Sequence, residues 1–351
     1  MAALLGCALY KTEEKNYTYS NHYYDGKFHN FEPISLMNFK DTFNMLKRFV
    51  FEKRIDPIPT QPLPVIPLTP TRLAIEQSEH TSLYRLGHSS LLLSLKQEFW
   101  LIDPVFSERV SPFSWMGPKR FHAPPISIEA LPKIKGIIIS HDHYDHLDEE
   151  TIKALADRVT YFVVPLGVGK HLRNWGVSEN KIHELDWWED IVLGELTLTA
   201  TPAQHFSGRG IADRDKTLWC SWVIRIKEER IFFSGDSGYF SGFKRIGKKY
   251  GPFDLTILEN GAYSTDWAQV HMTPEETLQA HIDLKGKALL AVHNGTFDLA
   301  MHSWYEPLER LTTLAEQQQI KILTPKIGEK ISMTQLNQVT RWWQEYMPIK
   351  N

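Results

Sequence analysis

The sequence predicts an α/β fold with mixed β-sheets, and three observations support this prediction. Short apolar runs typical of buried strands recur along the chain. Segments with helical patterning lie between several of these runs, as in folds where helices cover a sheet. One pair of runs is separated by only a short polar turn, which indicates a hairpin and therefore antiparallel as well as parallel pairing.

The first strands of the main domain are predicted at 91–95 and 99–102, on either side of the polar turn 96–98. A proline-rich, aromatic loop, 106–125, follows and is too long to be a simple connector. A β-branched run at 136–139 predicts the next strand. Asp148 then caps a helix that extends to about residue 157.

The second half of the chain continues the alternation of strands and helices. Its apolar runs predict strands at 161–165, 196–204, 219–226, 230–234, 255–258 and 289–292. Thr273, Pro274 and Glu276 predict the start of a helix, because they suit the N-cap, the first turn and the capping box. Two further helices are predicted from about Pro307 and about Thr334.

The composition is that of an ordinary globular protein, with 351 residues, 42% hydrophobic and 23% charged, and a formal net charge of −3. Such a nearly neutral charge argues against nucleic-acid binding. The sequence contains no run of eighteen apolar residues and therefore predicts no membrane-spanning helix. Two distant cysteines, Cys7 and Cys220, exclude a disulfide scaffold.

Residues 1–80 are predicted to form an extended arm, an amphipathic helix at 35–52 and a proline-rich linker at 56–70. The basic amphipathic helix could pack on its own domain or lie in a membrane interface. Leu4-Leu5-Gly6-Cys7 resembles a bacterial lipoprotein cleavage box but lacks the basic and long apolar regions of a signal. A lipoprotein or periplasmic location and a plain cytoplasmic one therefore both stay open.

The most informative segment is 136–148, where a buried strand breaks into Ser-His-Asp-His-Tyr-Asp-His-Leu-Asp. His141 and His143 alternate, so their side chains leave the same face of an extended backbone. Asp145 continues that alternation, whereas His146 turns to the other side. So many imidazoles and carboxylates are costly at the end of a buried strand unless a divalent cation compensates them. One segment could therefore serve two neighbouring metal ions.

Three later residues follow apolar strands in the same manner, namely His205, Asp236 and His293. Since α/β folds place their chemistry at the carboxyl ends of strands, we expect these side chains to join the 136–148 segment. Asp236 is flanked by glycines, which allow its backbone to come close to a site without a clash. On its own, each of these residues has an ordinary structural interpretation, as a turn aspartate or a packed histidine. Their shared position after strands favours metal binding.

The predicted ligands divide into two sets joined by one carboxylate. His141, His143 and His205 would bind one ion, Asp145, His146 and His293 a second, and Asp236 would bridge both. Nitrogen and oxygen ligands without cysteine fit Zn²⁺ best, with iron or manganese as substitutes. Two such ions lower the pKa of bound water, so that a bridging hydroxide can attack phosphorus or a carbonyl. Asp145 and Asp236 are therefore also predicted to be catalytic.

Most of the other histidines, including His88, are predicted to be structural. His271 is the exception, because it precedes the capped helix and follows an aromatic stretch at 263–267. We expect it to contact a substrate phosphate.

From about Leu86 to Glu329 the chain resembles the N-acyl-phosphatidylethanolamine-hydrolysing phospholipase D branch of the metallo-β-lactamase superfamily. The segment 140–148 carries the resemblance together with several flanking motifs. These include Met-Gly-Pro-Lys-Arg-Phe at 116–121, Glu-Leu-Asp-Trp-Trp-Glu at 184–189, Gly-Asp-Ser-Gly-Tyr at 235–239 and Val-His-Asn-Gly-Thr-Phe at 292–297. The chain departs from the mammalian-type pattern at Asp142, at Asn294 and after Tyr263, which leaves the headgroup and acyl-chain preference open.

The resemblance implies an αββα sandwich of two mixed β-sheets flanked by helices, with residues 81–351 as the catalytic domain. It also implies two zinc ions at the seven positions above. The expected reaction cleaves the phosphodiester on the headgroup side of N-acyl-phosphatidylethanolamine and gives phosphatidic acid and an N-acylethanolamine. Tyr144 and Tyr263 lie in matching motifs and are expected to bind substrate with His271.

A phospholipid substrate implies a peripheral encounter with a membrane surface. The expected contact is an exposed aromatic and basic rim. The candidates for it are Trp115, Met116, Lys119 and Arg120, with Lys244, Arg245, Lys248 and Lys249. A homodimer is compatible with the sequence. Two alternatives to this function stay open: a broader metal-dependent hydrolase of lactones or small phosphodiesters, and a non-catalytic protein stabilised by metal.

Overall fold

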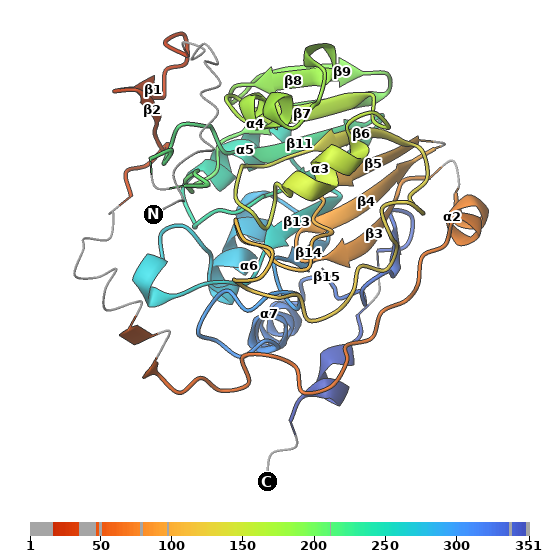
Figure 1. The fold of residues 1–351 in the computed structure, drawn as a ribbon. Coiled ribbons are helices and arrows are strands. Elements are labelled where there is room, and N and C mark those ends of the chain that lie inside the picture. The colour runs from red at the N-terminus through yellow and green to blue at the C-terminus, as the bar shows by residue number, and fades with distance from the viewer. Residues whose placement is uncertain are drawn as a thin grey trace, which may run out of the picture.

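The structure is a computed structural model that describes residues 17–34, 47–48, 51–77, 80–96, 98–210, 212–336 and 339–348. Within these residues, two seven-stranded mixed β-sheets pack face to face, and helices cover their outer faces (Figure 1). This arrangement confirms the predicted αββα sandwich.

The first sheet has the strand order β16-β3-β4-β5-β6-β7-β8. Its strands are β3 (Ser82–Gly87), β4 (Ser90–Leu95), β5 (Glu98–Ile102), β6 (Ile134–Ile138), β7 (Tyr161–Pro165), β8 (Ile182–Leu185) and β16 (Lys330–Ser332). Pairing is antiparallel from β16 to β5 and parallel from β5 to β8.

The second sheet has the order β15-β14-β13-β12-β11-β10-β9. Its strands are β9 (Asp190–Leu193), β10 (Leu196–Thr201), β11 (Ser221–Ile226), β12 (Glu229–Phe233), β13 (Leu255–Glu259), β14 (Leu289–Val292) and β15 (Ile322–Leu323). Pairing is antiparallel from β9 to β12 and parallel from β12 to β15, so the predicted hairpin β11–β12 is confirmed.

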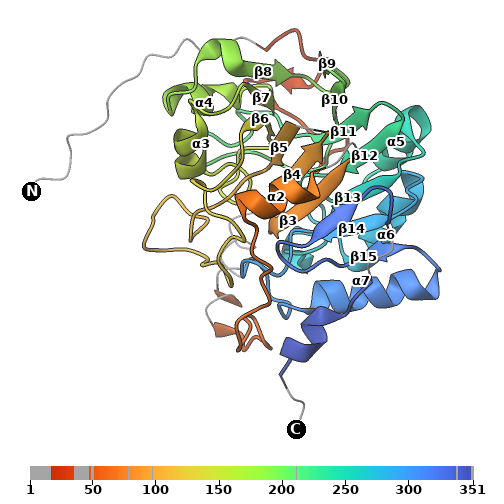
Figure 2. The same cartoon turned by 90° about the vertical axis from the view of Figure 1, so that its right-hand side faces the viewer.

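Helices α3 (Glu149–Leu155) and α4 (Gly169–Asn174) lie on one side of the sandwich. Helices α5 (Gly242–Tyr250), α6 (Pro274–Asp283) and α7 (Glu306–Gln317) lie on the other side, as Figure 2 shows. The structure also describes α2 (Pro70–Glu76), the short hairpin β1 (Tyr23–Tyr24) and β2 (Lys27–Phe28), and the 3₁₀ helices Glu179–Lys181, Thr265–Trp267 and Trp342–Tyr346.

Side chains that point alternately to the two faces of a strand build the apolar layers on both sides of the first sheet. Leu91 and Leu93 of β4 enter the apolar cluster between the sheets, whereas Leu92 enters the cluster that contains α3 and α4 residues. Successive side chains of a strand point to opposite faces, so one strand serves both layers. A third cluster packs α5, α6 and α7 on the second sheet.

The capping box at the start of α6 is confirmed, with the side chains of Thr273 and Glu276 each bonded to the other's backbone N–H. The helix predicted from Thr334 is wrong. Residues around Thr334 form a turn, and further on the backbone of Thr340 pairs with the hydroxyl of Thr324 instead of with a helical neighbour. The next helical turn is the 3₁₀ segment Trp342–Tyr346.

Much of the predicted N-terminal helix at 35–52, and the whole Leu4–Cys7 segment, lie outside the described residues. Among the residues that are described, no helix is long and apolar enough to cross a membrane.

Candidate metal centre

The ends of four strands carry the polar side chains that meet at one edge of the sandwich. β6 ends shortly before His141, β12 shortly before Asp236 and β14 directly before His293. His205 follows β10, in a stretch without regular structure. Apolar strands are therefore followed by metal-type residues, as predicted, and the strands that carry them come from both sheets.

A glycine allows the two sheets' loops to approach each other. Gly235 has a φ of +57°, and a Cβ at this position would lie 2.6 Å from the Cβ of Ser140. Only glycine accepts both this left-handed conformation and this contact without strain. The predicted role of the glycines around Asp236, to allow a close backbone approach, agrees with this geometry.

The first group consists of His141, His143, His205 and Asp236, each of which offers a ligand atom within 4.8 Å of the others. His143 Nδ1 lies 2.9 Å from His141 Nε2 and 3.2 Å from His205 Nε2. Three imidazole nitrogens therefore converge on one point, as the sequence predicts for the first ion.

The second group consists of Asp145, His146 and His293, joined by His88. Asp145 Oδ2 lies 3.3 Å from His293 Nε2 and 3.7 Å from His146 Nε2. The structure therefore brings the predicted residues of the second set together as well.

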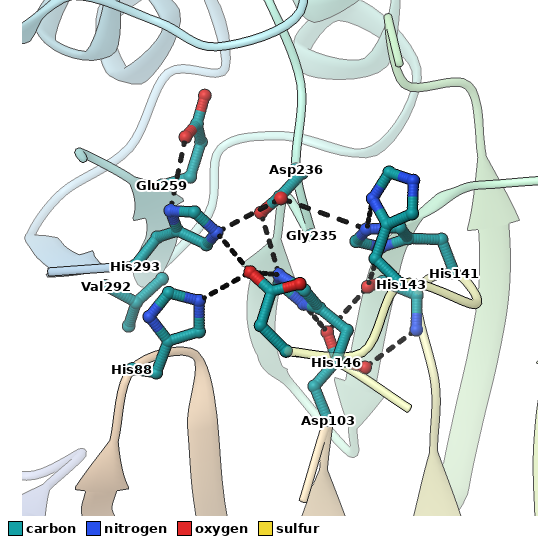
Figure 3. Close-up of polar contacts among 12 residues, drawn as sticks. His88, Asp103, His141, His143, His146, Gly235, Asp236, Glu259, Val292 and His293 are labelled. Atoms are coloured by element: carbon teal, nitrogen blue, oxygen red, sulfur yellow. Dashed lines mark hydrogen bonds and ion pairs between the residues drawn. The ribbon is translucent and has the colours of Figure 1, made fainter. Parts of the chain in front are cut away.

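Asp236 lies between the two groups, with His293 on one side and His141 and His143 on the other (Figure 3). Its Oδ1 is 3.1 Å from His146 Nε2, and its Oδ2 is 3.1 Å from His293 Nε2. Its Oδ2 is also 3.8 Å from His141 Nε2. A carboxylate placed in this way can contact ions in both groups.

Several of these atoms are buried without a hydrogen-bond partner, although they face one another closely. His146 Nε2, His293 Nε2 and Asp236 Oδ1 are in this condition. Such atoms are costly unless something else satisfies them. Imidazole nitrogens and carboxylate oxygens are ligands for divalent cations, so the residues present fit bound metal ions.

The charges in the centre favour an ionised carboxylate. Burial by itself would raise the pKa of Asp236, but His146 and His293 outweigh it and hold this pKa well below its usual range.

A second layer of hydrogen bonds orients the histidine rings. Asp103, which follows β5, accepts from His146 Nδ1 at 2.7 Å and from the Ser140 N–H at 2.7 Å. His205 Nδ1 donates to the Val270 carbonyl at 3.0 Å. Partners of this kind fix the tautomer and leave Nε2 directed into the site.

His88, predicted to be structural, belongs to the centre. Its Nε2 lies 3.0 Å from Asp145 Oδ2, and its ring centroid lies 4.0 Å from that of His293. A signal for it existed in the sequence, because His88 directly follows the strand β3, as the predicted ligands follow theirs.

Glu259 was also missed, although it ends the apolar strand β13. Its carboxylate accepts from the Met272 N–H at 2.6 Å and lies 3.0 Å from His271 Nδ1. Burial raises the pKa of Glu259. His271 itself is where the prediction expected it, with its ring 5.1 Å from that of His205 and 5.3 Å from that of His293.

The two predicted substrate-binding tyrosines have their hydroxyls engaged by the protein. Tyr144 donates to the Arg209 carbonyl at 2.8 Å, and the Arg209 guanidinium lies 3.9 Å over the tyrosine ring. Tyr263 donates to Glu306 at 2.9 Å and stacks on His302. Neither hydroxyl bonds one of the metal-type side chains.

The structure exposes some residues of the predicted rim and buries one of them. Trp115 is 72% exposed and Met116 is 47% exposed, as a contact surface requires. Arg120 is instead buried, and its guanidinium donates to the backbone carbonyls of Val105 and Phe106. Its long side chain holds the loop that follows β5 rather than reaching solvent.

Comparisons with known proteins identify the family of the chain. Residues 100–294 match the family model of the beta-lactamase superfamily domain. An uncharacterised protein of Mycobacterium bovis is 41% identical over 93% of this chain and 88% of its own length. The N-acyl-phosphatidylethanolamine-hydrolysing phospholipase D 1 of Caenorhabditis elegans is 36% identical over 66% of this chain and 68% of its own length.

Among solved structures, the isothiocyanate hydrolase from Delia radicum gut bacteria is similar, with a TM-score of 0.58 and 21% identity. The match covers 71% of this chain and 98% of that one, and it supports the fold. The family implies divalent metal ions, which the clusters around Asp236 fit. The chain therefore belongs to the metallo-β-lactamase superfamily, as a metal-dependent hydrolase whose relatives include N-acyl-phosphatidylethanolamine-hydrolysing phospholipases D.

Proposed function

We propose that this chain is a two-zinc phosphodiesterase that hydrolyses N-acyl-phosphatidylethanolamine-type phospholipids on the headgroup side. The oxygen of a water molecule would join phosphorus, and the bond from phosphorus to the N-acylethanolamine oxygen would break. The products are phosphatidic acid and an N-acylethanolamine. The similarity to the phospholipase D 1 of Caenorhabditis elegans supports this choice of substrate.

The observation that carries the proposal is the shared carboxylate of Asp236. Its oxygens lie 3.1 Å from His146 Nε2 and His293 Nε2 of the second group. Its Oδ2 also lies 3.8 Å from His141 Nε2 and from His205 Nε2 of the first group. We assign the first zinc to His141, His143 and His205, the second to Asp145, His146 and His293, and Asp236 to both. Bound zinc ions would activate a water molecule and stabilise negative charge that develops on the phosphate.

His271 is assigned to the substrate in this proposal. Its Nδ1 donates a hydrogen bond to the Glu259 carboxylate, so Nε2 is the nitrogen left to face the substrate. His88 is assigned to orienting Asp145, because its Nε2 already bonds that carboxylate.

Exposed apolar side chains near the site support a lipid surface as the place of reaction. Trp115 and Met116 are exposed on the loop after β5. A groove of about 480 Å³, lined partly by Ile58, Pro118 and Lys119, runs beside this loop. It shares Asp298 with a narrow crevice at His293. Aromatic and basic side chains together suit a phospholipid interface.

The proposal is tested by incubating the zinc-loaded protein with N-acyl-phosphatidylethanolamine, phosphatidylethanolamine and a panel of lactones, and following the products by mass spectrometry. We expect N-acylethanolamine and phosphatidic acid from the first lipid in equal amounts. Turnover of lactones without release of N-acylethanolamine would support the broader hydrolase instead. Two bound metal ions with no hydrolysis of any of these compounds, or of bis-p-nitrophenyl phosphate, would contradict the enzymatic proposal.

A further inference from the structure

A side chain of the N-terminal arm contacts the backbone of one proposed zinc ligand. The amide of Asn30 donates from Nδ2 to the His205 carbonyl at 2.7 Å and accepts at Oδ1 from the His205 N–H at 2.9 Å. These two bonds link residues 175 positions apart in the chain. One amide therefore pairs both polar backbone groups of His205, as a neighbouring strand would.

His205 needs such a partner because it lies after the end of β10. The residues that follow this strand have no regular structure, so their backbone groups lack the ladder partners that strands provide. Asn30 supplies both a donor and an acceptor, which a single carboxylate or hydroxyl could not do in the same geometry.

The orientation of the Asn30 amide is determined by its neighbours. The indole N–H of Trp219 also donates to Asn30 Oδ1, at 3.1 Å. Two donors therefore face this oxygen, and a flipped amide would place its NH₂ group against both of them. The bond from Gln204 Nε2 to the Glu32 carbonyl at 2.9 Å holds the arm beside the same loop.

The arm is fixed to the body close to Asn30. Phe28 is 1% exposed and belongs to the apolar cluster between the sheets. Its N–H donates to the Asp215 carbonyl at 2.8 Å. This anchor, two residues before Asn30, restricts the positions that the Asn30 side chain can take.

The ring of His205 is held independently of its backbone. Nδ1 donates to the Val270 carbonyl, and Nε2 lies 3.2 Å from His143 Nδ1 and 3.8 Å from Asp236 Oδ2. With the backbone held by Asn30 and the ring held by Val270, the direction of Nε2 is determined before any ion binds.

We infer that Asn30 is a positioning residue of the metal centre, which orders His205 for the ion bound by His141, His143 and His205. The inference rests on the ligand assignment proposed above and not on the identity of the substrate. Removing a hydrogen-bonded partner of a metal ligand typically weakens metal binding by about 10- to 100-fold. Asn30→Ala should therefore weaken one of two zinc sites by about this factor and leave the other unchanged.

The test measures both zinc affinities of the metal-free, full-length protein by competition with a chromophoric chelator. Visible absorption of the cobalt-substituted protein reports the ligand geometry. Glu32→Ala is the matched control, because it removes a bond from the arm to the Ser241 N–H at 3.0 Å without touching His205. Asn30→Asp is an isosteric second variant, which keeps the acceptor and places an oxygen against the His205 carbonyl.

We expect Asn30→Ala and Asn30→Asp to weaken one site and change the cobalt spectrum, while Glu32→Ala keeps wild-type affinities and spectrum. Unchanged affinities in both Asn30 variants would overturn the inference and leave the ligand assignment intact. Equal losses in Glu32→Ala and Asn30→Ala would also overturn it, because the arm would then act only through general stability. Wild-type protein that binds no zinc would overturn the ligand assignment, and this inference with it.

Discussion

Replacing Glu259 by glutamine should change how His271 presents its imidazole to the site. The Met272 N–H, at 2.6 Å, requires an acceptor at one oxygen of residue 259. A glutamine must therefore place its carbonyl oxygen there and its NH₂ group against His271 Nδ1. That nitrogen would then have to accept, so the proton of the neutral ring would move to Nε2.

The size of the effect follows from the loss of a charged acceptor for His271 Nδ1. A hydrogen bond to a charged group contributes about 1.5–3 kcal/mol, and a bond to a fully buried carboxylate belongs to this class. Because the bond to Glu259 is expected to orient His271 for the reaction, its weakening should lower kcat/KM by about 10- to 150-fold, since 1.4 kcal/mol corresponds to a factor of ten. The bound zinc should stay the same, because Glu259 is 4.0 Å from His293 Nδ1 and is not among the proposed ligands.

The assay is hydrolysis of bis-p-nitrophenyl phosphate by Glu259→Gln, His271→Gln and the double variant, with zinc content and Tm recorded for each. Because Glu259 is expected to act through His271, the two losses should not add. Glu276→Gln, in the nearby capping box of α6, is the control and should keep wild-type activity. Wild-type kcat/KM in Glu259→Gln, or additive losses in the double variant, would refute this reasoning.

Three further predictions follow from the structure. Asp236→Asn should reduce phosphodiester hydrolysis by at least about 100-fold and release one or both zinc ions, because a bridging anion is lost. Far-UV circular dichroism should stay unchanged, and wild-type rates would contradict the bridging assignment. Trp115→Ser combined with Met116→Ser should weaken binding to anionic phospholipid vesicles, measured by co-sedimentation, and leave hydrolysis of soluble bis-p-nitrophenyl phosphate unchanged. Equal vesicle binding by wild type and variant would show that this loop does not contact lipid. Burial lowers the pKa of His281 to about 4, whereas a histidine in the unfolded chain has a pKa of about 6.5. The unfolded chain therefore takes up a proton first as the pH falls, and the folded state loses about 2 kcal/mol of stability between about pH 7 and pH 4.5. Denaturant unfolding at pH 7 and pH 4.5 should show a smaller loss for His281→Gln, and a parallel loss in both proteins would disprove the linkage.

The architecture and the centre of the site could largely be predicted from local patterns. Apolar runs mark buried strands whatever their partners, and the order of parallel strands brings their carboxyl ends to one edge. The seven residues predicted as ligands therefore lie together, because each of them follows such a strand or belongs to the 141–146 segment.

The residues that were missed depend on contacts between distant segments. His88 follows a strand and Glu259 ends one, but a single histidine or glutamate at a strand end has many ordinary roles. Their position shows only when β3 and β13 are brought beside the 141–146 segment. Asn30 gives no local signal at all, since its role comes from two bonds to a residue 175 positions away.

The wrong expectations have the same origin. Arg120 lies in a polar-looking motif next to exposed Trp115, and nothing local shows that its guanidinium turns inward to backbone carbonyls. The segment near Thr334 has helical patterning, yet Thr324 from a distant strand end satisfies the Thr340 backbone instead. Long-range polar pairing outweighs local propensity at both places.

The central claim is that two ions share Asp236, and anomalous diffraction from zinc-soaked crystals at the zinc edge tests it most directly. The account predicts two peaks about 3.5–4 Å apart, one among His141, His143 and His205 and the other among Asp145, His146 and His293, each contacting one Asp236 carboxylate oxygen. A single peak, or two peaks of which neither contacts Asp236, would contradict it.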